Sequence, residues 1–180
     1  GCGHVGYFLC QDLAEEGAQL TVTDIDKDKI DVVVNEFGAK AVGPDEIYGV
    51  DADIFAPCAL GAIINDDTLK VLDVDIVVGG ANNQLAEPRH AQEVEDKGIL
   101  YGPDYLVNAG GLINVYAEIE GWPAERSLRK AGEIYNTLLR ILELAEAEGI
   151  TTAEASDRVA EQRMEEVRYL HRTELGSLDF

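Results

Sequence analysis

The stretch Gly1-Cys2-Gly3-His4-Val5-Gly6 decides the fold. It matches the pattern G-x-G-x-x-G and leads directly into a helical pattern over residues 5–16. In such a turn the first glycine permits a tight bend, the second lets backbone N–H groups approach a pyrophosphate, and the third allows close packing of helix on strand. The N-terminus of the following helix adds hydrogen-bond donors and the positive end of its dipole. The turn therefore predicts a site for the phosphates of a dinucleotide.

A strand predicted over residues 20–23 follows this helix and ends at Asp24. A carboxylate at that place can accept hydrogen bonds from both hydroxyls of an adenosine ribose, and it repels a 2′-phosphate. Asp26 and Asp28 add further negative charge, and no arginine follows Asp24 to hold a phosphate. The sequence therefore favours NAD over NADP as the cofactor.

Short apolar runs alternate with helical patterns through the first hundred residues. Further strands are predicted over residues 54–56, 75–78 and 99–101, and further helices over residues 28–37, 66–71 and 89–97. Gly17, Gly38 and Gly98 each follow a helical pattern, where a left-handed C-cap residue is needed. Strands that alternate with helices indicate parallel β-α-β units. We therefore expect an α/β fold with a Rossmann-type doubly wound parallel sheet, whose first strand would precede Gly1.

From Asp104 onward the pattern is helical. Asp104 is the expected N-cap of a helix over residues 104–120, and a second helix with a continuous apolar stripe ends at Gly149. Thr151 and Glu154 form a predicted capping box that opens a last helix to about residue 170, after which residues 176–180 are expected to fray. The predicted division is a cofactor-binding domain over residues 1–122, followed by C-terminal helices over residues 123–180.

Composition excludes several classes of protein. The 180 residues carry 14 Lys and Arg against 35 Asp and Glu, a net charge of −21, which argues against nucleic acid or an anionic membrane as partner. A hydrophobic share of 46% excludes disorder as the default expectation, because a chain of this length can bury a sizeable core. There is no long apolar segment and no signal-peptide pattern, so we expect a cytoplasmic protein. Adaptation to a salt-rich cytoplasm and the ordinary acidity of a bacterial enzyme are both open explanations of the charge.

Cys2, Cys10 and Cys58 lie far apart in the sequence and match no metal-ligand spacing. We therefore expect three free thiols and no metal site.

Two further motifs follow predicted strands, and ligands bind beyond the carboxyl ends of parallel strands. These motifs are Pro57-Cys58-Ala59-Leu60-Gly61 and Gly79-Gly80-Ala81-Asn82-Asn83-Gln84, and a third motif, Asn108-Ala109-Gly110-Gly111, lies in the helical pattern after Asp104. The adjacent amides of Asn82 and Asn83 can donate to and accept from a carboxamide, a ribose or a carboxylate, or they can simply form a turn. Gly110 and Gly111 inside a helical pattern each cost about 1 kcal/mol relative to alanine, which suggests a close approach by a ligand or by backbone.

Together with Leu85 and the run from Ala109 to Val115, these motifs resemble the Glu/Leu/Phe/Val dehydrogenase family, and within it the leucine dehydrogenase branch. The resemblance runs from the glycine turn to about Arg163. It implies oxidative deamination of an L-amino acid to its 2-oxo acid and ammonia, with NAD as hydride acceptor. The implied cofactor contacts are Gly1, Cys2, Gly3, His4, Val5, Gly6 and Tyr7 at the pyrophosphate, Asp24 and Ile25 at the adenosine, Cys58, Ala59 and Leu60 along the cleft, and Asn82 and Asn108 near the nicotinamide. The implied substrate contacts are Asn83 at the carboxylate and Leu112 and Val115 in the side-chain pocket.

The apolar pair Leu112 and Val115 cannot satisfy the side-chain carboxylate of glutamate, so the resemblance favours leucine, valine or isoleucine as substrate. Phenylalanine dehydrogenase is the alternative within the family, and a non-catalytic NAD-sensing regulatory domain is the alternative from another class.

The catalytic lysines and aspartate of the family belong to an N-terminal domain, and no lysine of this chain matches them. The chain also begins at Gly1 without methionine. We therefore expect a fragment that is poorly folded and inactive alone, from an enzyme that forms homo-oligomers.

Overall fold

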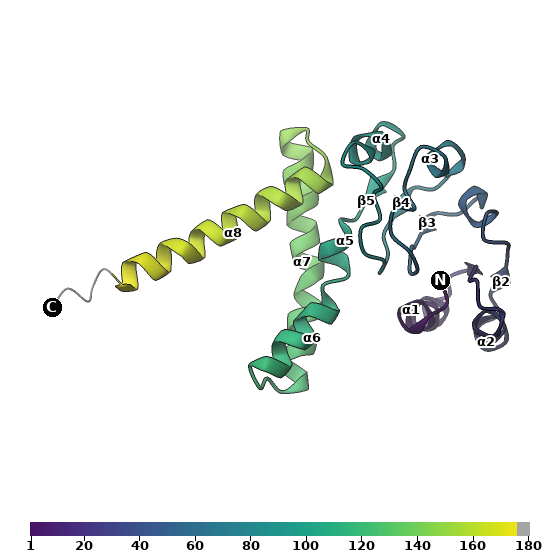
Figure 1. Ribbon diagram of the computed structural model, residues 1–180, viewed down its shortest axis with the longest axis horizontal. Coiled ribbons are helices and arrows are strands. Elements are labelled where there is room, and N and C mark those ends of the chain that lie inside the picture. Colours follow the sequence, from purple (N-terminus) through teal and green to yellow (C-terminus); the bar gives the residue numbers. More distant parts are fainter. Residues whose placement is uncertain (176–180) are drawn as a thin grey trace.

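Short strands and helices alternate in the N-terminal part of the protein (Figure 1). The computed structural model describes residues 1–175, with side chains to residue 168. The elements of the alternating part are α1 (His4–Glu15), β1 (Thr21–Val22), α2 (Lys27–Phe37), β2 (Lys40–Ala41), the 3-10 helix η1 (Ile47–Gly49), β3 (Ile54–Phe55), α3 (Thr68–Val71), β4 (Ile76–Val77), α4 (His90–Asp96) and β5 (Leu100–Tyr101). Four helices follow: α5 (Asp104–Val107), α6 (Gly110–Ile119), α7 (Ala124–Glu148) and α8 (Thr152–Leu175).

The described strands form two parallel sheets. β1 pairs with β2, and β4 lies between β3 and β5, with Val77 opposite both Phe55 and Tyr101. The predicted parallel α/β class is therefore confirmed. A single continuous sheet is not seen among the described residues, because no hydrogen-bonded pair joins β1 to β3.

Each sheet has its own core, and a third core lies between the C-terminal helices. The first core includes Val22 of β1 and Val33 of α2. The second core includes Val77, Val94 and Ile64 and lies around β3, β4 and β5. Ile141, Ala145 and Ala155 join α7 to α8 in the third.

Glycines end the helices at the positions that the sequence predicts. Gly17, Gly38 and Gly98 have φ angles of 86°, 68° and 77°, and Gly149, which ends α7, has a φ of 63°. Left-handed backbone is easily adopted only by a residue without a Cβ atom. At the other end of α2 the Asp26 side chain accepts a hydrogen bond from the N–H of Asp28.

Some predictions about the elements were wrong. The strand β2 was missed because it is only two residues long and both of them are exposed, so it shows no alternating pattern. The helix predicted over residues 104–120 is two helices, α5 and α6, which are separated at Asn108 and Ala109. Asp104 is the first residue of α5 rather than its N-cap, which is Pro103.

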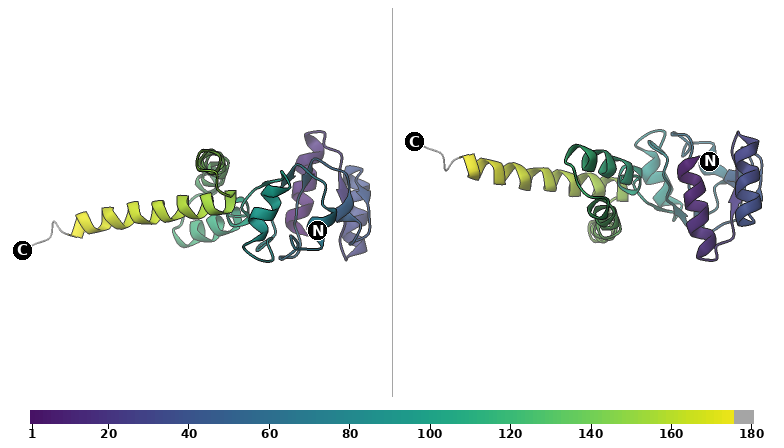
Figure 2. Two further views of the ribbon diagram at one scale, coloured as in Figure 1. Left: turned by 90° about the horizontal axis from the view of Figure 1, so that it is seen from above. Right: turned by 90° about the horizontal axis from the view of Figure 1, so that it is seen from below.

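Contacts at the first turn of α8 fix it to the sheet domain. The Thr152 N–H donates to Oε1 of Glu95 at 2.9 Å, and the buried Thr152 hydroxyl donates to the carbonyl of Tyr101 at 2.7 Å. The capping box is half formed: the Glu154 N–H donates to Oγ1 of Thr151 at 3.1 Å, but the Glu154 carboxylate pairs with Arg158. Val159, in the second turn, still packs against the core between α7 and α8, and the C-terminal part of α8 then extends away from the rest of the protein in the views of Figure 1 and Figure 2. The predicted fraying at residues 176–180 lies outside the described residues.

None of the helices within residues 1–175 combines the length and the apolar character that a membrane span requires.

Candidate functional site

The glycine turn packs against the loop that follows β3. A methyl group added at Gly1 would lie 2.7 Å from the Cβ of Ala59, and one added at Gly6 would lie 1.9 Å from the carbonyl oxygen of Gly1. Neither position can therefore hold a side chain. A methyl group at Gly3 would meet no atom within 4 Å, and Gly3 caps α1 without a side-chain hydrogen bond. The backbone at Gly3 and the first N–H groups of α1 are thus open to an anionic ligand.

Asp24, at the carboxyl end of β1, is held to this turn. Its Oδ2 accepts from the N–H of Cys2 at 2.6 Å, and its Oδ1 accepts from the N–H of Asp26 at 2.9 Å. Partial burial acts to raise the pKa of Asp24, but the two backbone hydrogen bonds and the nearby cations outweigh it, and the pKa is lowered. Asp24 is therefore ionised at neutral pH. The next residue, Ile25, leaves 96% of its surface exposed.

The loops after β3 and β4 are in direct contact with each other. The Ala81 N–H donates to the Pro57 carbonyl at 2.8 Å, and the Ala62 N–H donates to the Asn83 carbonyl at 2.6 Å. A methyl group at Gly79 would lie 2.3 Å from the Pro57 carbonyl oxygen, and one at Gly80 would lie 2.7 Å from Cγ1 of Val5 on α1. The glycine turn and both loops therefore form one tightly packed edge.

The structure also brings Asn82 and Asn108 together. Nδ2 of Asn108 donates to Oδ1 of Asn82 at 2.6 Å. Asn83 is exposed and has a positive φ of 51°. The backbone therefore turns sharply at Asn83, between Asn82 and Gln84. Of the three residues predicted to line the cleft, Cys58 is half-buried, whereas Ala59 and Leu60 are exposed.

Comparison with known proteins identifies the family. The model of the Glutamate/Leucine/Phenylalanine/Valine dehydrogenase family matches residues 10–168. The chain belongs to this family.

Several members of the family are similar to the chain over most of its length. Leucine dehydrogenase from Thermoactinomyces intermedius is 54% identical over 93% of this chain and 46% of its own length. Phenylalanine dehydrogenase from Caldalkalibacillus thermarum is 44% identical over 92% of this chain and 46% of its own length. The crystal structure of L-tryptophan dehydrogenase from Nostoc punctiforme aligns with a TM-score of 0.91 at 48% identity, over 94% of this chain and 52% of that one. The chain thus spans about half the length of the relatives it matches.

Among the described residues, some of the predicted site residues share no side-chain hydrogen bond with the others. Leu112 and Val115 lie on α6 with 73% and 53% of their surfaces exposed. Tyr7 uses both of its donors within the protein: its N–H donates to the Gly3 carbonyl and its hydroxyl to Oε2 of Glu36. Methyl groups at Gly110 and Gly111 would meet no atom within 4 Å, so the backbone approach expected there is absent among the described residues. Both glycines instead lie in the first turn of α6.

The three cysteines of the chain are free thiols, as the sequence predicts. Burial raises the pKa of the Cys2 and Cys10 thiols, which makes both poor nucleophiles at neutral pH.

The sequence did not predict a role for Gln84, which lies in the loop after β4 that carries Asn82 and Asn83. The fully buried Gln84 donates from Nε2 to the carbonyls of Gly79 and Ala81, at 2.8 and 2.9 Å. The residue stands within the motif that the sequence singles out, but a polar side chain in a loop gives no periodic signal that it is buried.

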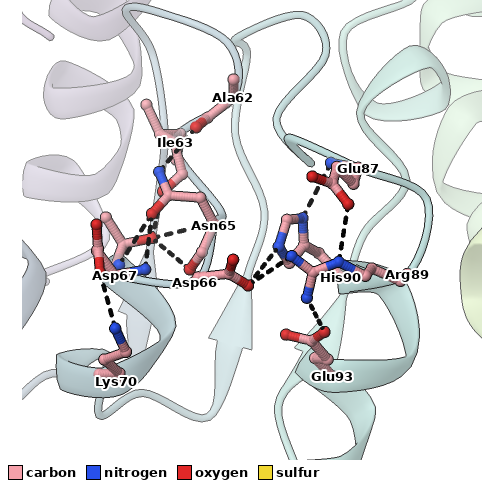
Figure 3. A network of polar contacts seen from close by, with 11 residues as sticks. Ala62, Ile63, Asn65, Asp66, Asp67, Lys70, Glu87, Arg89, His90 and Glu93 are labelled. Atoms are coloured by element: carbon pink, nitrogen blue, oxygen red, sulfur yellow. Dashed lines mark hydrogen bonds and ion pairs between the residues drawn. The ribbon is translucent and has the colours of Figure 1, made fainter.

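An ionic cluster joins the two loops on the side of α3 and α4 (Figure 3). Arg89 pairs with Asp66, Glu87 and Glu93, and Nε2 of the buried His90 lies 3.2 Å from Oδ1 of Asp66. Asp66, His90 and Glu93 are close enough to suggest a metal site. However, Nδ1 of His90 accepts a hydrogen bond from the Glu87 N–H at 2.9 Å, so Nε2 carries the proton of the neutral ring. Because that nitrogen has no free lone pair and Arg89 already holds the carboxylates, the cluster is an ionic crosslink between the loops.

Proposed function

We propose that this chain is the NAD-binding part of an amino acid dehydrogenase that deaminates leucine, valine or isoleucine oxidatively to the 2-oxo acid and ammonia. One observation carries the proposal: the hydrogen bond from the Cys2 N–H to Oδ2 of Asp24, at 2.6 Å. It fixes a carboxylate suited to an adenosine ribose at the edge of a glycine turn suited to a pyrophosphate.

The residues of the glycine turn fit the phosphates of NAD. The α1 N-terminus provides N–H donors and the positive end of a helix dipole, and the backbone at Gly3 is open to a ligand. Gly1 and Gly6 serve the packing of the turn, while His4 and Val5 border it as exposed residues.

Asp24 fits the ribose of NAD and opposes that of NADP. An ionised carboxylate offers about four lone-pair positions, of which the Cys2 and Asp26 N–H groups occupy two. Two positions remain for the two ribose hydroxyls, whereas a 2′-phosphate would meet a negative charge. The exposed side chain of Ile25 offers an apolar contact to the adenosine.

The loops after β3 and β4 would hold the other half of the cofactor and the substrate. Backbone of Cys58, Ala59 and Leu60 would line the cleft, Asn82 and Asn108 would lie at the nicotinamide, and Asn83 would bind the substrate carboxylate. The Asn108–Asn82 hydrogen bond and the contact of both loops with the glycine turn support this arrangement.

The side chains of α6 support an apolar substrate. Leu112 and Val115 offer no partner for a second carboxylate, and burying that charge unpaired would be costly. Leucine, valine and isoleucine fit such a pocket.

NAD, when bound, supplies the acceptor for the hydride from the α-carbon. We propose that the lysines and aspartate which transfer protons lie outside this chain, so that the chain alone is inactive. Four of the six lysines of the chain support this, because they already have partners: Lys29, Lys70 and Lys130 pair with Asp26, Asp67 and Glu133, and Lys97 donates to the Leu69 carbonyl.

We also propose that the two sheets are parts of one Rossmann-type sheet, in a domain of residues 1–122 that the helices of residues 123–180 complete. The glycine turn supports this because it contacts both sheets, β1 through Cys2 and Asp24, and the loop after β3 through Gly1 and Ala59.

The test is the formation of NADH by the full-length protein with L-leucine, L-phenylalanine or L-glutamate. We expect kcat/KM to be highest for leucine and negligible for glutamate. Preference for phenylalanine would shift the assignment to an aromatic amino acid dehydrogenase. Binding of NAD without turnover of any amino acid would favour a regulatory NAD sensor.

A further inference from the structure

Gln84 is buried completely, yet among the described residues its side chain makes hydrogen bonds only to the loop that precedes it. Its Nε2 uses both hydrogens, one on the Gly79 carbonyl and one on the Ala81 carbonyl. These two carbonyls flank Gly80, at the start of the loop that presents Asn82 and Asn83. The amide therefore fixes the path of the backbone just before the two asparagines.

The backbone of Gln84 connects the same loop to α5. Its N–H donates to Oδ2 of Asp104, the first residue of α5, at 3.1 Å. Asn108 follows the last residue of α5 and donates to Asn82. The loop and the short helix are thus joined at both ends, through Gln84 and Asp104 at one end and through Asn82 and Asn108 at the other.

Packing alone does not account for an amide at this position. The Oε1 atom of Gln84 is buried and has no hydrogen-bond partner among the described residues. Burying such an acceptor costs stability, and an apolar side chain of the same size would avoid that cost. The two donors of Nε2 are what glutamine offers and an apolar side chain lacks.

We propose that Gln84 is a positioning residue, which sets the places of Asn82 and Asn83 relative to Asn108 at the nicotinamide and substrate end of the site. This inference rests on the proposed dehydrogenase function. The adenosine end of the site, at Asp24 and the glycine turn, shares no hydrogen bond with Gln84 among the described residues. Loss of the amide should therefore affect the two ends differently.

The experiment replaces Gln84 in the full-length protein by methionine, which has nearly the same length but no donor. Gln92→Met is the matched control, because Gln92 lies on the surface of α4 and its amide, in the part of the chain that the structure describes, donates only to Asp96. Gln84→Glu is a second variant, which keeps the shape and removes both N–H donors. Three quantities are measured in each: kcat/KM for L-leucine, the Kd of ADP-ribose, which lacks the nicotinamide, and the amide exchange rate at Ala81, whose N–H donates to Pro57.

In Gln84→Met we expect kcat/KM for leucine to fall about tenfold or more, the loss that corresponds to one or two hydrogen bonds. The Kd of ADP-ribose should stay within about twofold of the wild-type value, since its contacts are intact. Exchange at Ala81 should become faster, and Gln92→Met should match the wild type in all three quantities.

Either of two results overturns the inference while leaving the proposed function intact: an unchanged kcat/KM in Gln84→Met, or a loss of ADP-ribose affinity as large as the loss of kcat/KM. If Gln84→Glu does not fold, the methionine variant decides. Absence of NADH formation by the wild-type protein would instead overturn the proposed function, and the inference with it.

Discussion

Nδ2 of Asn108 donates a hydrogen bond to Oδ1 of Asn82 across 2.6 Å, and so joins the end of α5 to the loop after β4. The two residues are 26 positions apart in the sequence. Because the bond uses Oδ1 of Asn82, the Nδ2 of that side chain is directed elsewhere and can donate to a ligand carbonyl. The orientation of one amide thus depends on the other.

This dependence predicts strong coupling between the two asparagines. Asn108→Ala should lower kcat/KM for leucine, since Asn82 loses the partner that orients it, and Asn82→Ala should lower it further because its donor is lost. The double variant should be little worse than Asn82→Ala alone, with a coupling of about 1 kcal/mol. Steady-state kinetics of the four proteins measure this. Additive losses would show that the two residues act independently.

Asp24→Asn should weaken NAD specifically. The variant removes the negative charge that accepts from the ribose hydroxyls, and hydrogen bonds to a charged group contribute about 1.5–3 kcal/mol. We expect KM for NAD to rise at least about tenfold, with KM for leucine unchanged. The ratio of kcat/KM with NAD to kcat/KM with NADP should become smaller.

Asp28→Asn is the control for that variant, because Asp28 carries the same charge in the first turn of α2, and no hydrogen bond of its carboxylate is found among the described residues. If both variants change KM for NAD equally, the effect comes from the general negative field and not from a ribose contact.

His90 should matter more for stability than the arginine beside it. His90→Ala leaves the Glu87 N–H without its acceptor and opens a cavity at a side chain that is 1% exposed. The expected loss in free energy of unfolding is about 1–3 kcal/mol or more. Arg89→Ala removes three exposed ion pairs and should cost less than about 1 kcal/mol. Urea denaturation measures the free energy of unfolding of both variants. A lower value for Arg89→Ala than for His90→Ala would contradict this prediction.

Asp66 should make the same crosslink sensitive to acid. Hydrogen bonds from Arg89 and His90 lower the pKa of Asp66 below its ordinary value of 3.8. The carboxylate therefore stabilises the fold above that value, and the contribution is lost as the pH falls through the lowered pKa. Asp66→Asn should lower Tm at about pH 7 and approach the wild type at about pH 3. A difference in Tm that is the same at both pH values would contradict this.

The sequence predicts those parts of the fold that depend on local chemistry. Glycine is needed for left-handed caps, and Gly38 and Gly149 are found there. Asp24 could be singled out because a carboxylate at that strand end has a known use. The hydrogen bond between Cys2 and Asp24 could not be predicted, since it depends on how the turn meets the strand.

Features that depend on tertiary contacts escaped prediction. The break between α5 and α6 is hidden in the sequence, because the apolar spacing continues through Asn108. Glutamine in a loop is usually exposed, so the sequence gives no sign that Gln84 is buried. It is buried because two loops pack against each other. The role of His90 likewise depends on Asp66, 24 positions away, and no local pattern links them.

Fluorescence titration of the full-length protein with NADH and with NADPH tests the proposed cofactor preference most directly. We propose that Asp24, ionised and fixed by the Cys2 N–H, makes this a site for NAD. NADH should then bind at least about tenfold more tightly than NADPH, as expected when a 2′-phosphate must approach a carboxylate. Equal affinities, or tighter binding of NADPH, would contradict it.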